Sequence, residues 1–572
     1  MNFRINDRDG PSRIGEIKIN NQKIISPNIL FLHTKRFKSP NFSDILITNT
    51  EEKTKKPYFK TIKNILIDNK LKDKKKDFFL LEEKDIFTLE YAYQIFRKPK
   101  KFLKTIIKNK EELGSQKIMY TPSIAEPINL SLLVYLGTDL FDSTRAIISA
   151  RNKTMFFVDG NKKTVDLDEN PCVCQTCKNK KPKDMTFEEI LEHNYRILYS
   201  EIKNIRNHIK NKNLRGLVEK RVKTDPHLTT VLRNLDKDNY SYLEEKTPVS
   251  SKNNISATSI ESINRPEIKR FQKRTISRYK KPKHTKILLL LPCSAKKPYS
   301  FSKSHSFFKR AIFSSDNQYV VHEVIITSPL GVVPRELELI YPASNYDIPV
   351  TGYWFEDEKK MIRNYLKMYL KENKYDFIIS HLPEEINDFI NDIVKIDIST
   401  CIKHPTSNES TDKLKNVLIK ETKKFEKLKK SERLKEDVEA FLSYQFGKKI
   451  AKKLIYNTSI KGRYPYLKIM KENVQLGMLV KEKGLVSLTL EGAKILFEEK
   501  KNLVKIYDDF ELKGSIFAPG IKNADINIRI GDEVAVIRAN QLVGIGSALM
   551  SGSQMKELTY GEAIKMRHLK KD

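Results

Sequence analysis

The sequence predicts an α/β multidomain protein that ends in a small β-barrel, and three observations support this prediction. The chain has 572 residues, which is more than one hydrophobic core usually holds and suggests about four domains. The uninterrupted apolar run 287–291 predicts a buried strand, and its end at Pro292 places Cys293 at the carboxyl end of that strand. Short alternating strands broken by glycine, between Gly514 and Gly561, predict a β-barrel after residue 500.

Composition predicts a polyanionic partner. Lys+Arg number 106 and Asp+Glu 72, which gives a net charge of +34. Neutralising phosphates with lysine and arginine releases counterions, so nucleic acid is favoured over the alternative that the lysine excess reflects codon bias. No apolar stretch approaches the roughly 20 residues that span a bilayer, and the N-terminus lacks a signal-peptide pattern. We therefore expect a cytoplasmic protein without a membrane partner.

Patterning divides the chain into five predicted parts. Residues 1–210 hold a cysteine-rich knot, and residues 285–425 hold the strand that ends at Cys293. Residues 426–500 predict a small, basic α/β domain, and residues 501–572 the β-barrel. Residues 211–284 are basic, with a Ser/Thr/Asn stretch at 247–264, and predict an irregular linker with a cationic arm. This arm is either a solvated tether or a nucleic-acid contact.

Three of the five cysteines lie together and predict a metal site. Cys172, Cys174 and Cys177 form a Cys-x-Cys-x-x-Cys turn, and Zn²⁺ needs one further ligand to complete a tetrahedral set. His193, near the start of a helix with apolar residues at three- and four-residue spacing, is the leading candidate, and His208 is the alternative. A closed set leaves no position for water, so the expected Zn²⁺ is structural.

The residues around this knot carry a resemblance to a known family. Gly137-Thr138-Asp139-Leu140-Phe141-Asp142, then Ala150-Arg151, precede the cysteines, and His193-Asn194 follow them. With Ser12-Arg13-Ile14-Gly15-Glu16 near the start, this pattern resembles the tRNA-guanine transglycosylases. The resemblance implies a (β/α)₈ barrel with an inserted zinc subdomain, and it puts Asp142 where that family keeps its nucleophilic carboxylate.

The departures from that family are as informative as the match. Residues 40–130 contain no Asp-Ser-Gly-Gly-Phe-Gln motif and no glycine-rich loop to seat a base. A nucleophile without the pocket that orients its substrate loses most of its advantage. We therefore expect a degenerate TIM-barrel-like transglycosylase domain, retained for shape, zinc and tRNA contacts. In this domain Asp142 is a substrate-binding candidate rather than the catalyst.

The C-terminal third carries a second resemblance. The string Gly514-Ser515-Ile516-Phe517-Ala518-Pro519-Gly520, followed by Gly531-Asp532-Glu533-Val534, resembles the PUA domain, an RNA-binding barrel of tRNA-modifying enzymes. Residues 430–500 look like the α/β segment that precedes PUA in archaeal transglycosylases. They are basic as well, through Lys461, Arg463, Lys468, Lys471 and Lys481.

The loop after the central strand concentrates reactive side chains. In sequence order they are Cys293, Ser294, Lys296, Lys297, Tyr299, Ser302 and His305. A cysteine at a strand end packs more often than it reacts. The expected tRNA-binding modules on both sides nevertheless favour a catalytic role for Cys293. This Pro-Cys-Ser to Lys-Pro-Tyr loop resembles the signature of archaeosine synthase. Two later blocks agree, Thr327 to Glu338 and Tyr341 to Gly352, and the chain is identified as a member of that family.

The resemblance implies a specific reaction on tRNA. The base 7-cyano-7-deazaguanine, already inserted at position 15 of the D-loop, would receive an amine donor across its nitrile to give an amidine. Free lysine is the implied donor, and direct transfer from glutamine or ammonia is the runner-up. A radical-SAM partner subunit, where present, would process the lysine adduct.

The residue types suit this chemistry. A thiolate adds readily to a nitrile, so Cys293 is the expected nucleophile, with Lys296, Lys297, His305 and the following helix N-terminus expected to lower its pKa. His305 is a candidate proton shuttle, and Ser294, Tyr299 and Ser302 are expected to contact substrate. Glu336 or Glu338 would hold the donor's α-amino group, and Arg335 its carboxylate or a phosphate. The alternative for these three residues is an ordinary charged helix start.

Two other classes of function stay open. One is a true tRNA-guanine transglycosylase, which the missing base pocket disfavours. The other is a non-catalytic tRNA-binding partner subunit in which Cys293 is merely buried. The sequence leaves open the nitrogen donor, the need for a partner subunit and whether the chain is a homodimer.

Overall fold

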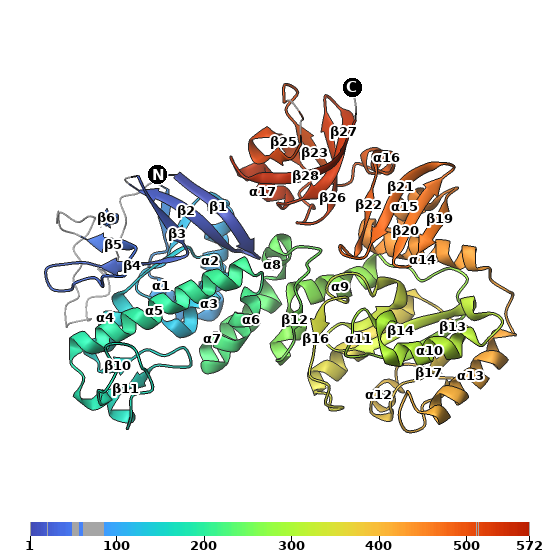
Figure 1. Ribbon diagram of the computed structural model, residues 1–572, viewed down its shortest axis with the longest axis horizontal. Helices are drawn as coiled ribbons and strands as arrows, with labels where there is room; N and C mark the ends of the chain where they lie inside the picture. Colours follow the sequence, from blue (N-terminus) through green and yellow to red (C-terminus); the bar gives the residue numbers. More distant parts are fainter. Residues whose placement is uncertain are drawn as a thin grey trace. The chain divides into compact units, whose positions relative to one another are not determined.

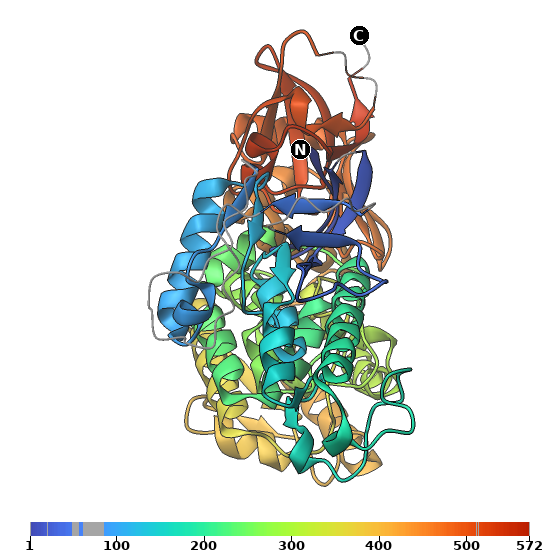
Figure 2. The ribbon, with the colours of Figure 1, turned by 90° about the vertical axis from the view of Figure 1, so that its left-hand side faces the viewer.

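The computed structural model describes residues 2–19, 21–48, 56–60, 85–510, 512 and 514–570. The chain forms two compact units, and Figures 1 and 2 show their helices and strands from two directions. The first comprises Met1–Thr247 with Glu557–Gly561, and the second Pro248–Lys556 with Glu562–Asp572. Within the described part, no helix combines the length and apolarity needed to cross a bilayer.

The first unit is built on a six-stranded parallel sheet. Its strands, in spatial order, are β6 (Tyr58–Lys60), β5 (Ile45–Thr48), β4 (Asn28–Leu32), β9 (Leu140–Asp142), β8 (Ile118–Tyr120) and β7 (Ile86–Thr88). An antiparallel sheet of β1 (Asn2–Asp9), β2 (Ser12–Ile19) and β3 (Gln22–Ser26) precedes it. Six parallel strands in the described part, fewer than the eight of a full barrel, confirm the predicted degenerate barrel.

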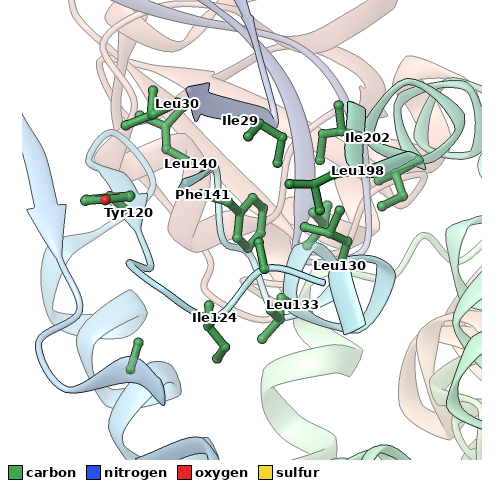
Figure 3. Packing of buried hydrophobic residues seen from close by; sticks show 14 of the residues in the cluster. Ile29, Leu30, Tyr120, Ile124, Leu130, Leu133, Leu140, Phe141, Leu198 and Ile202 are labelled. Carbon is green, nitrogen blue, oxygen red and sulfur yellow. The ribbon is translucent and has the colours of Figure 1, made fainter. Parts of the chain in front are cut away.

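Helices cover this sheet and close its core. They include α1 (Ala92–Phe96), α2 (Pro99–Leu113), α3 (Pro127–Tyr135), α4 (Thr144–Arg151) and α5 (Phe187–Lys210). Figure 3 shows Leu198 and Ile202 of α5 directed toward Phe141 of β9, and all three are fully buried. The three- and four-residue spacing of the α5 apolar residues therefore does position a core-facing helix, as predicted.

The segment 211–284 corrects an expectation. It was expected to be an irregular linker, but it holds the helices α6 (Leu214–Arg221), α7 (Pro226–Asp238), α8 (Tyr240–Lys246) and α9 (Pro266–Ser277). On α7, the residues Leu228, Val231, Leu232 and Leu235 repeat at helical spacing and are buried. The basic composition of the whole segment led to the linker expectation, although α7 itself carries only Arg233 and Lys237.

The second unit contains a five-stranded sheet of order β15-β14-β13-β17-β18. Its strands are β13 (Ile287–Pro292), β14 (Val321–Thr327), β15 (Gly331–Pro334), β17 (Phe377–Ser380) and β18 (Ile398–Ser399), and only the edge strand β15 runs antiparallel. The central strand β13 sends Ile287, Leu289 and Leu291 into one hydrophobic cluster and Leu288 and Leu290 into another. Burial on both faces explains its uninterrupted apolar run.

Helices form the outer layers of this α/β sandwich. The first cluster is completed by α10 (Lys303–Phe313) and α13 (Asn408–Thr422). The second is completed by α9, α11 (Glu356–Glu372) and α12 (Glu384–Ile390). Connections on both faces of a mostly parallel sheet match the predicted central α/β domain.

Two smaller elements of structure complete this unit. The first has helices α14 (Lys430–Phe446), α15 (Lys448–Ile455) and α16 (Leu490–Glu498) around the antiparallel strands β19 (Ser459–Arg463), β20 (Tyr466–Lys471), β21 (Val474–Val480) and β22 (Leu485–Leu488). The second is a six-stranded sheet of order β24-β28-β27-β26-β23-β25, with one helix, α17 (Gly552–Glu557). Its strands are β23 (Leu503–Ile506), β24 (Ile516–Phe517), β25 (Ile521–Ala524), β26 (Glu533–Arg538), β27 (Gln541–Ala548) and β28 (Glu562–Leu569).

Candidate active site

Cys293 lies at the carboxyl edge of the central sheet. The strand β13 ends at Pro292, directly before it, as predicted. The chain leaves β13 for β14 on one side and later returns to β17 on the other side, so the strand order reverses at β13. Ligand sites of open α/β sheets form outside the carboxyl ends of strands at such a switch point.

A cluster of hydroxyl groups surrounds the Cys293 thiol. Tyr346 Oη lies 2.6 Å from Tyr299 Oη and 2.6 Å from Thr327 Oγ1. The Thr327 side chain also acts on the thiol, since it lowers the pKa of Cys293. Lys297 Nζ lies 4.1 Å from the centre of the Tyr346 ring, which holds the amine beside the same group. Cys293, Lys297, Tyr299, Thr327 and Tyr346 together form what we call the thiol cluster.

The pKa of Cys293 is raised, which corrects the expectation that cations would lower it. Burial is the largest cause, and the Thr327 side chain and the charge of Lys297 oppose it without cancelling it. Burial likewise lowers the pKa of Lys297, and the charges of Cys293 and Asp347 oppose this shift. Burial and the neighbouring Arg335 lower the pKa of His305 to about 2, so this imidazole is neutral and supplies no positive charge to the thiol.

Both ring nitrogens of His305 are engaged. Nε2 lies 3.1 Å from the carbonyl oxygen of Pro292, and Nδ1 lies 2.8 Å from the Arg335 guanidinium. Since arginine can only donate, Nδ1 accepts and Nε2 donates. His305 thus ties the end of β13 to Arg335, and a proton-shuttle role would require one of these bonds to break.

The remaining loop residues have more local partners. Ser302 caps α10 by accepting a hydrogen bond from the His305 backbone N–H at 3.2 Å. The Ser294 hydroxyl donates to the carbonyl of Lys296 at 2.9 Å, and the Lys296 side chain is exposed. The structure therefore separates the two adjacent lysines, since only Lys297 belongs to the thiol cluster.

Arg335, Glu336 and Glu338 lie in buried ionic networks. Glu338 accepts from Arg335 at 2.9 Å, from the Tyr464 hydroxyl at 2.6 Å and from the Ser300 backbone N–H at 2.9 Å. Arg335 also pairs with Glu323. These groups already have protein partners, so a ligand would compete with them or bind beside them.

Glu336 belongs to the second of these buried networks. It contacts His322 Nε2 at 3.1 Å and Tyr279 Oη at 3.2 Å, and Arg433 at 3.3 Å. Burial favours the protonated acid, but His322 and Arg433 outweigh burial and lower the pKa of Glu336 to about 2.

These two networks line a cavity of about 280 Å³. Polar residues on its wall include His305, Glu323, Arg335, Glu336, Glu338 and Tyr464. Cys293 does not line it, but His305 connects the two, because it lines the cavity and also bonds the residue before the thiol. The structure thus brings the predicted site residues into two adjoining groups, one around the thiol and one around the cavity.

Asp142 lies in the first unit and accepts three hydrogen bonds. Its carboxylate accepts from the Tyr120 hydroxyl at 2.7 Å and from the backbone N–H groups of Ser123 and Thr144 at 2.8 Å each. The side chain is fully buried at the end of β9. This arrangement suits a carboxylate that fixes the loops after β8 and β9.

The four predicted metal ligands lie together. One ligand atom from each of Cys172, Cys174, Cys177 and His193 lies within 4.8 Å of the others. His193 Nε2 lies 2.9 Å from the carbonyl of Phe156, which leaves Nδ1 facing the Cys177 sulfur at 3.2 Å. Asn194 holds the same segment by accepting from the Phe156 N–H at 2.7 Å. A histidine fixed through its second nitrogen is typical of metal sites, so the residues fit a tetrahedral ion.

Sequence reasoning missed Thr327 and Tyr346 as members of the thiol cluster. Thr327 could have been found, since it ends a strand parallel to β13 and Pro292 is in register with Ile326. Tyr346 could not, because it arrives through the short strand β16 (Tyr346–Asp347), which pairs with β12 (Ile255–Ser256) rather than with the central sheet.

Comparison with known proteins shows which families the chain resembles. Four family models match the chain. Residues 89–227 match "Queuine tRNA-ribosyltransferase", 268–418 a domain of unknown function, 436–501 "Patch-forming domain C2 of tRNA-guanine transglycosylase" and 509–570 the "PUA domain". The thiol cluster and the cavity-lining residues of the central sheet fall within the second of these.

Relatives match the chain over most of its length. The "Archaeosine synthase" of Haloferax volcanii is 38% identical, over 85% of this chain and 82% of the relative. The "Archaeosine synthase subunit alpha" of Methanosarcina acetivorans is 36% identical, over 86% and 80%. The "tRNA-guanine(15) transglycosylase" of Methanobrevibacter smithii is 28% identical, over 82% and 69%.

Proposed function

The chain belongs to the archaeosine synthase family, and from that premise we propose that it converts a nitrile to an amidine on tRNA. The family and the transglycosylase and PUA matches make it a tRNA-modifying enzyme of archaeosine biosynthesis. The proposed substrate is 7-cyano-7-deazaguanine at position 15 of the D-loop, and the proposed amine donor is free lysine. The observation that supports this most is the thiol at the switch point of the central sheet, ringed by proton donors.

The proposed reaction has two steps. The Cys293 thiolate adds to the nitrile carbon, a C–S bond forms, and the nitrile nitrogen takes a proton to give a thioimidate. The donor amine then attacks the same carbon, the C–S bond breaks, and the thiolate leaves as the amine loses a proton. No atom is lost, since the amidine contains the whole nitrile and the whole amine. Lys297 and the hydroxyls of Thr327 and Tyr346 are the groups beside the thiol that could exchange these protons.

The cavity beside the thiol cluster is the proposed donor site. Four carboxylates face it, Glu323, Glu336, Glu338 and Asp437, together with four basic side chains, Arg335, Arg433, Lys309 and Lys430. Charges of both signs suit an amino-acid donor, whose α-amino group a glutamate would hold and whose carboxylate an arginine would hold. His305 would separate the donor from Cys293 until its bond to Pro292 or Arg335 is exchanged.

The alternatives make different demands on the chain. Direct transfer from glutamine or ammonia would use the same thiol with another donor. A true transglycosylase would need Asp142 as nucleophile, which its three hydrogen bonds disfavour. A non-catalytic partner subunit would need no reactive thiol. The name "subunit alpha" in relatives supports a further subunit for this chain, and a homodimer is a separate proposal.

One experiment separates these functions. The protein is incubated with tRNA that carries the nitrile base and, separately, with isotopically labelled lysine, glutamine or ammonia, and the nucleosides are analysed by mass spectrometry. A lysine adduct supports the proposal, and a labelled amidine without lysine supports the runner-up. Release of the base in exchange for labelled guanine would identify a transglycosylase, and no product with any donor would leave a binding subunit.

A Zn²⁺ ion at Cys172, Cys174, Cys177 and His193 is proposed as a structural element of the first unit.

Replacing Lys297 is expected to slow the reaction at neutral pH. The pKa of Cys293 is raised by burial, so the thiolate fraction and the rate should increase as pH rises above neutrality. Lys297→Met removes a charge that lowers this pKa, and a further rise by about one unit would cost about tenfold in thiolate at pH 7. The readout is the pH profile of Cys293 alkylation, followed on its own peptide by mass spectrometry.

Lys296→Met is the matched comparison for this measurement. Its side chain is exposed and outside the thiol cluster, so the alkylation profile of Cys293 should stay unchanged. Equal profiles for both variants and the unmodified chain would show that Lys297 does not act on the thiol.

Binding of tRNA is expected to weaken steeply with added salt. On the exposed hairpin of β19 and β20, Lys461 lies opposite Lys468, and like charges directly opposite one another are unfavourable unless an anion bridges them. Lys461→Gln with Lys468→Gln should lower the slope of log affinity against log salt by about 1.4 to 1.8, as loss of two phosphate contacts predicts.

The control for this measurement is a second exposed pair. Lys415→Gln with Lys420→Gln, on α13, removes the same charge and should leave the slope closer to that of the unmodified chain. An affinity that salt does not alter would contradict the electrostatic interpretation, and equal effects of both pairs would show that only net charge matters.

A further inference from the structure

An uncharged loop exposes apolar side chains beside the thiol cluster. Residues 348–355 connect β16 to α11, and they contain no lysine, arginine, aspartate or glutamate in a chain that is 31% charged. Val350, Tyr353 and Phe355 are 74%, 71% and 60% exposed. Exposed apolar groups gathered in one segment mark an interaction site.

Both ends of this loop are tied to the thiol cluster. At its start, Tyr346 Oη bonds Thr327 Oγ1 at 2.6 Å. At its end, Glu358 in the first turn of α11 accepts from the Ser328 hydroxyl, and Ser328 follows Thr327 directly. The two ends of the loop are therefore held by two consecutive residues, Thr327 and Ser328. This fixes the loop beside the Cys293 site.

Internal contacts hold the aromatic side chains in place. Trp354 packs on Phe389 of α12, with ring centroids 5.8 Å apart. Tyr353 and Phe355, on either side of it, meet edge to face at 5.4 Å and 89°. The Thr351 hydroxyl accepts from the Tyr353 backbone N–H at 3.2 Å. Because the inward Trp354 anchors the segment, little ordering entropy remains to be lost when a ligand packs on its neighbours.

We propose that Tyr353 and Phe355 form a stacking platform for an unpaired tRNA nucleobase next to the base that Cys293 attacks. This inference rests on the proposed function. An enzyme that acts on a base inside folded RNA must take that base out of its stack, and the neighbouring base then loses a stacking partner. Aromatic side chains replace such partners in RNA-binding proteins.

Charge argues for a base rather than a phosphate at this rim. The loop has no cation. Of the two carboxylates that follow it, Glu356 pairs with Lys359 at 2.7 Å, and the exposed Asp357 would repel a phosphate. The electrostatic attraction of this strongly basic chain for RNA must therefore come from elsewhere, and the loop offers the face of an aromatic ring rather than a charge. Nucleobase faces are uncharged and bind aromatic rings without regard to sequence.

The chain provides its own probe of this loop. Trp354 is the only tryptophan in the sequence, so tryptophan fluorescence of the full chain reports on this segment alone. We would titrate the protein with a single-stranded RNA of the D-loop sequence, the same RNA annealed to its complement, and a tRNA with guanine at position 15. The single strand and the tRNA should change Trp354 emission, and the duplex should not.

Variants test which side chains carry the effect. Tyr353→Ala with Phe355→Ala keeps Trp354 and should weaken single-strand binding about tenfold or more, as loss of one base–aromatic stack predicts. Tyr456→Ala, at a tyrosine of similar exposure between α15 and β19, should bind as the unmodified chain does. Unchanged Trp354 emission of the RNA-free double variant shows that the loop has kept its fold; where emission shifts, Tyr353→Leu with Phe355→Leu replaces it.

Several results would overturn the platform. These are no emission change with single-stranded RNA, equal affinity for the duplex, and unchanged affinity of the double variant. Emission that depends on protein concentration without RNA, together with a dimer in sedimentation that the double variant loses, would identify a self-association surface instead. None of these readouts needs the nitrile or the reaction, so a failure of the proposed chemistry leaves the binding result interpretable.

Discussion

Cys293→Ser is expected to abolish conversion of the nitrile base in tRNA while tRNA affinity stays nearly the same. The substitution changes one atom at the carboxyl end of β13, and a serine hydroxyl at that place stays protonated and adds poorly to a nitrile. We expect a loss of about 10³-fold or more in single-turnover rate, the scale on which nucleophile removal acts. The rate is measured by mass spectrometry of nucleosides, and affinity by a separate binding titration.

Two matched variants sharpen this result. Cys401→Ser removes another free cysteine, one that follows β18, and should keep full activity. Asp142→Asn should keep substantial activity, because amidine formation breaks no glycosidic bond. Its effect is expected on thermal stability instead, since an amide replaces a buried carboxylate that accepts three hydrogen bonds. Near-normal turnover by Cys293→Ser would mean that the amine attacks the nitrile directly.

The sequence predicted those features that local pattern determines. The uninterrupted apolar run of β13 and its end before Cys293 follow from burial on both faces of a parallel sheet. The metal ligands could be found because three cysteines share one turn and His193 lies in the N-terminal part of a helix with a clear apolar stripe. The C-terminal strands were visible through their glycine spacing.

Features that depend on burial in three dimensions could not be predicted in this way. Nearby lysines suggested a lowered pKa for Cys293, but desolvation is the larger effect, and only the fold reveals that His305 is neutral and bonded on both sides. The helices between residues 211 and 284 were hidden because the basic composition and the Ser/Thr/Asn stretch of this segment outweighed the apolar spacing within each short helix. Pairing across long sequence distances, such as Tyr464 with Glu338, leaves no local signal at all.

Loss of a metal ligand is the other change with a large expected effect. Cys174→Ala should release the ion and lower the thermal transition of the first unit by about 10 °C or more, because binding of a structural Zn²⁺ contributes directly to folding. The segment that depends on it connects β10 (Thr154–Met155) to α5 and holds little regular structure, with only short strands and 3₁₀ turns. Metal content is measured by elemental analysis of folded protein, and stability by calorimetry.

The two histidines that the sequence offered distinguish a true site from a chance cluster. His193→Gln should reduce metal content as Cys174→Ala does, because Nδ1 faces the Cys177 sulfur and Nε2 is held by Phe156. His208→Gln, on the same helix, should keep the ion, since its Nδ1 lies 3.2 Å from the carbonyl of Asn213 and takes no part in the cluster. Folded protein without zinc would refute the site. If His193→Gln retained zinc and Cys174→Ala lost it, the three thiolates would hold the ion with another fourth ligand, such as water.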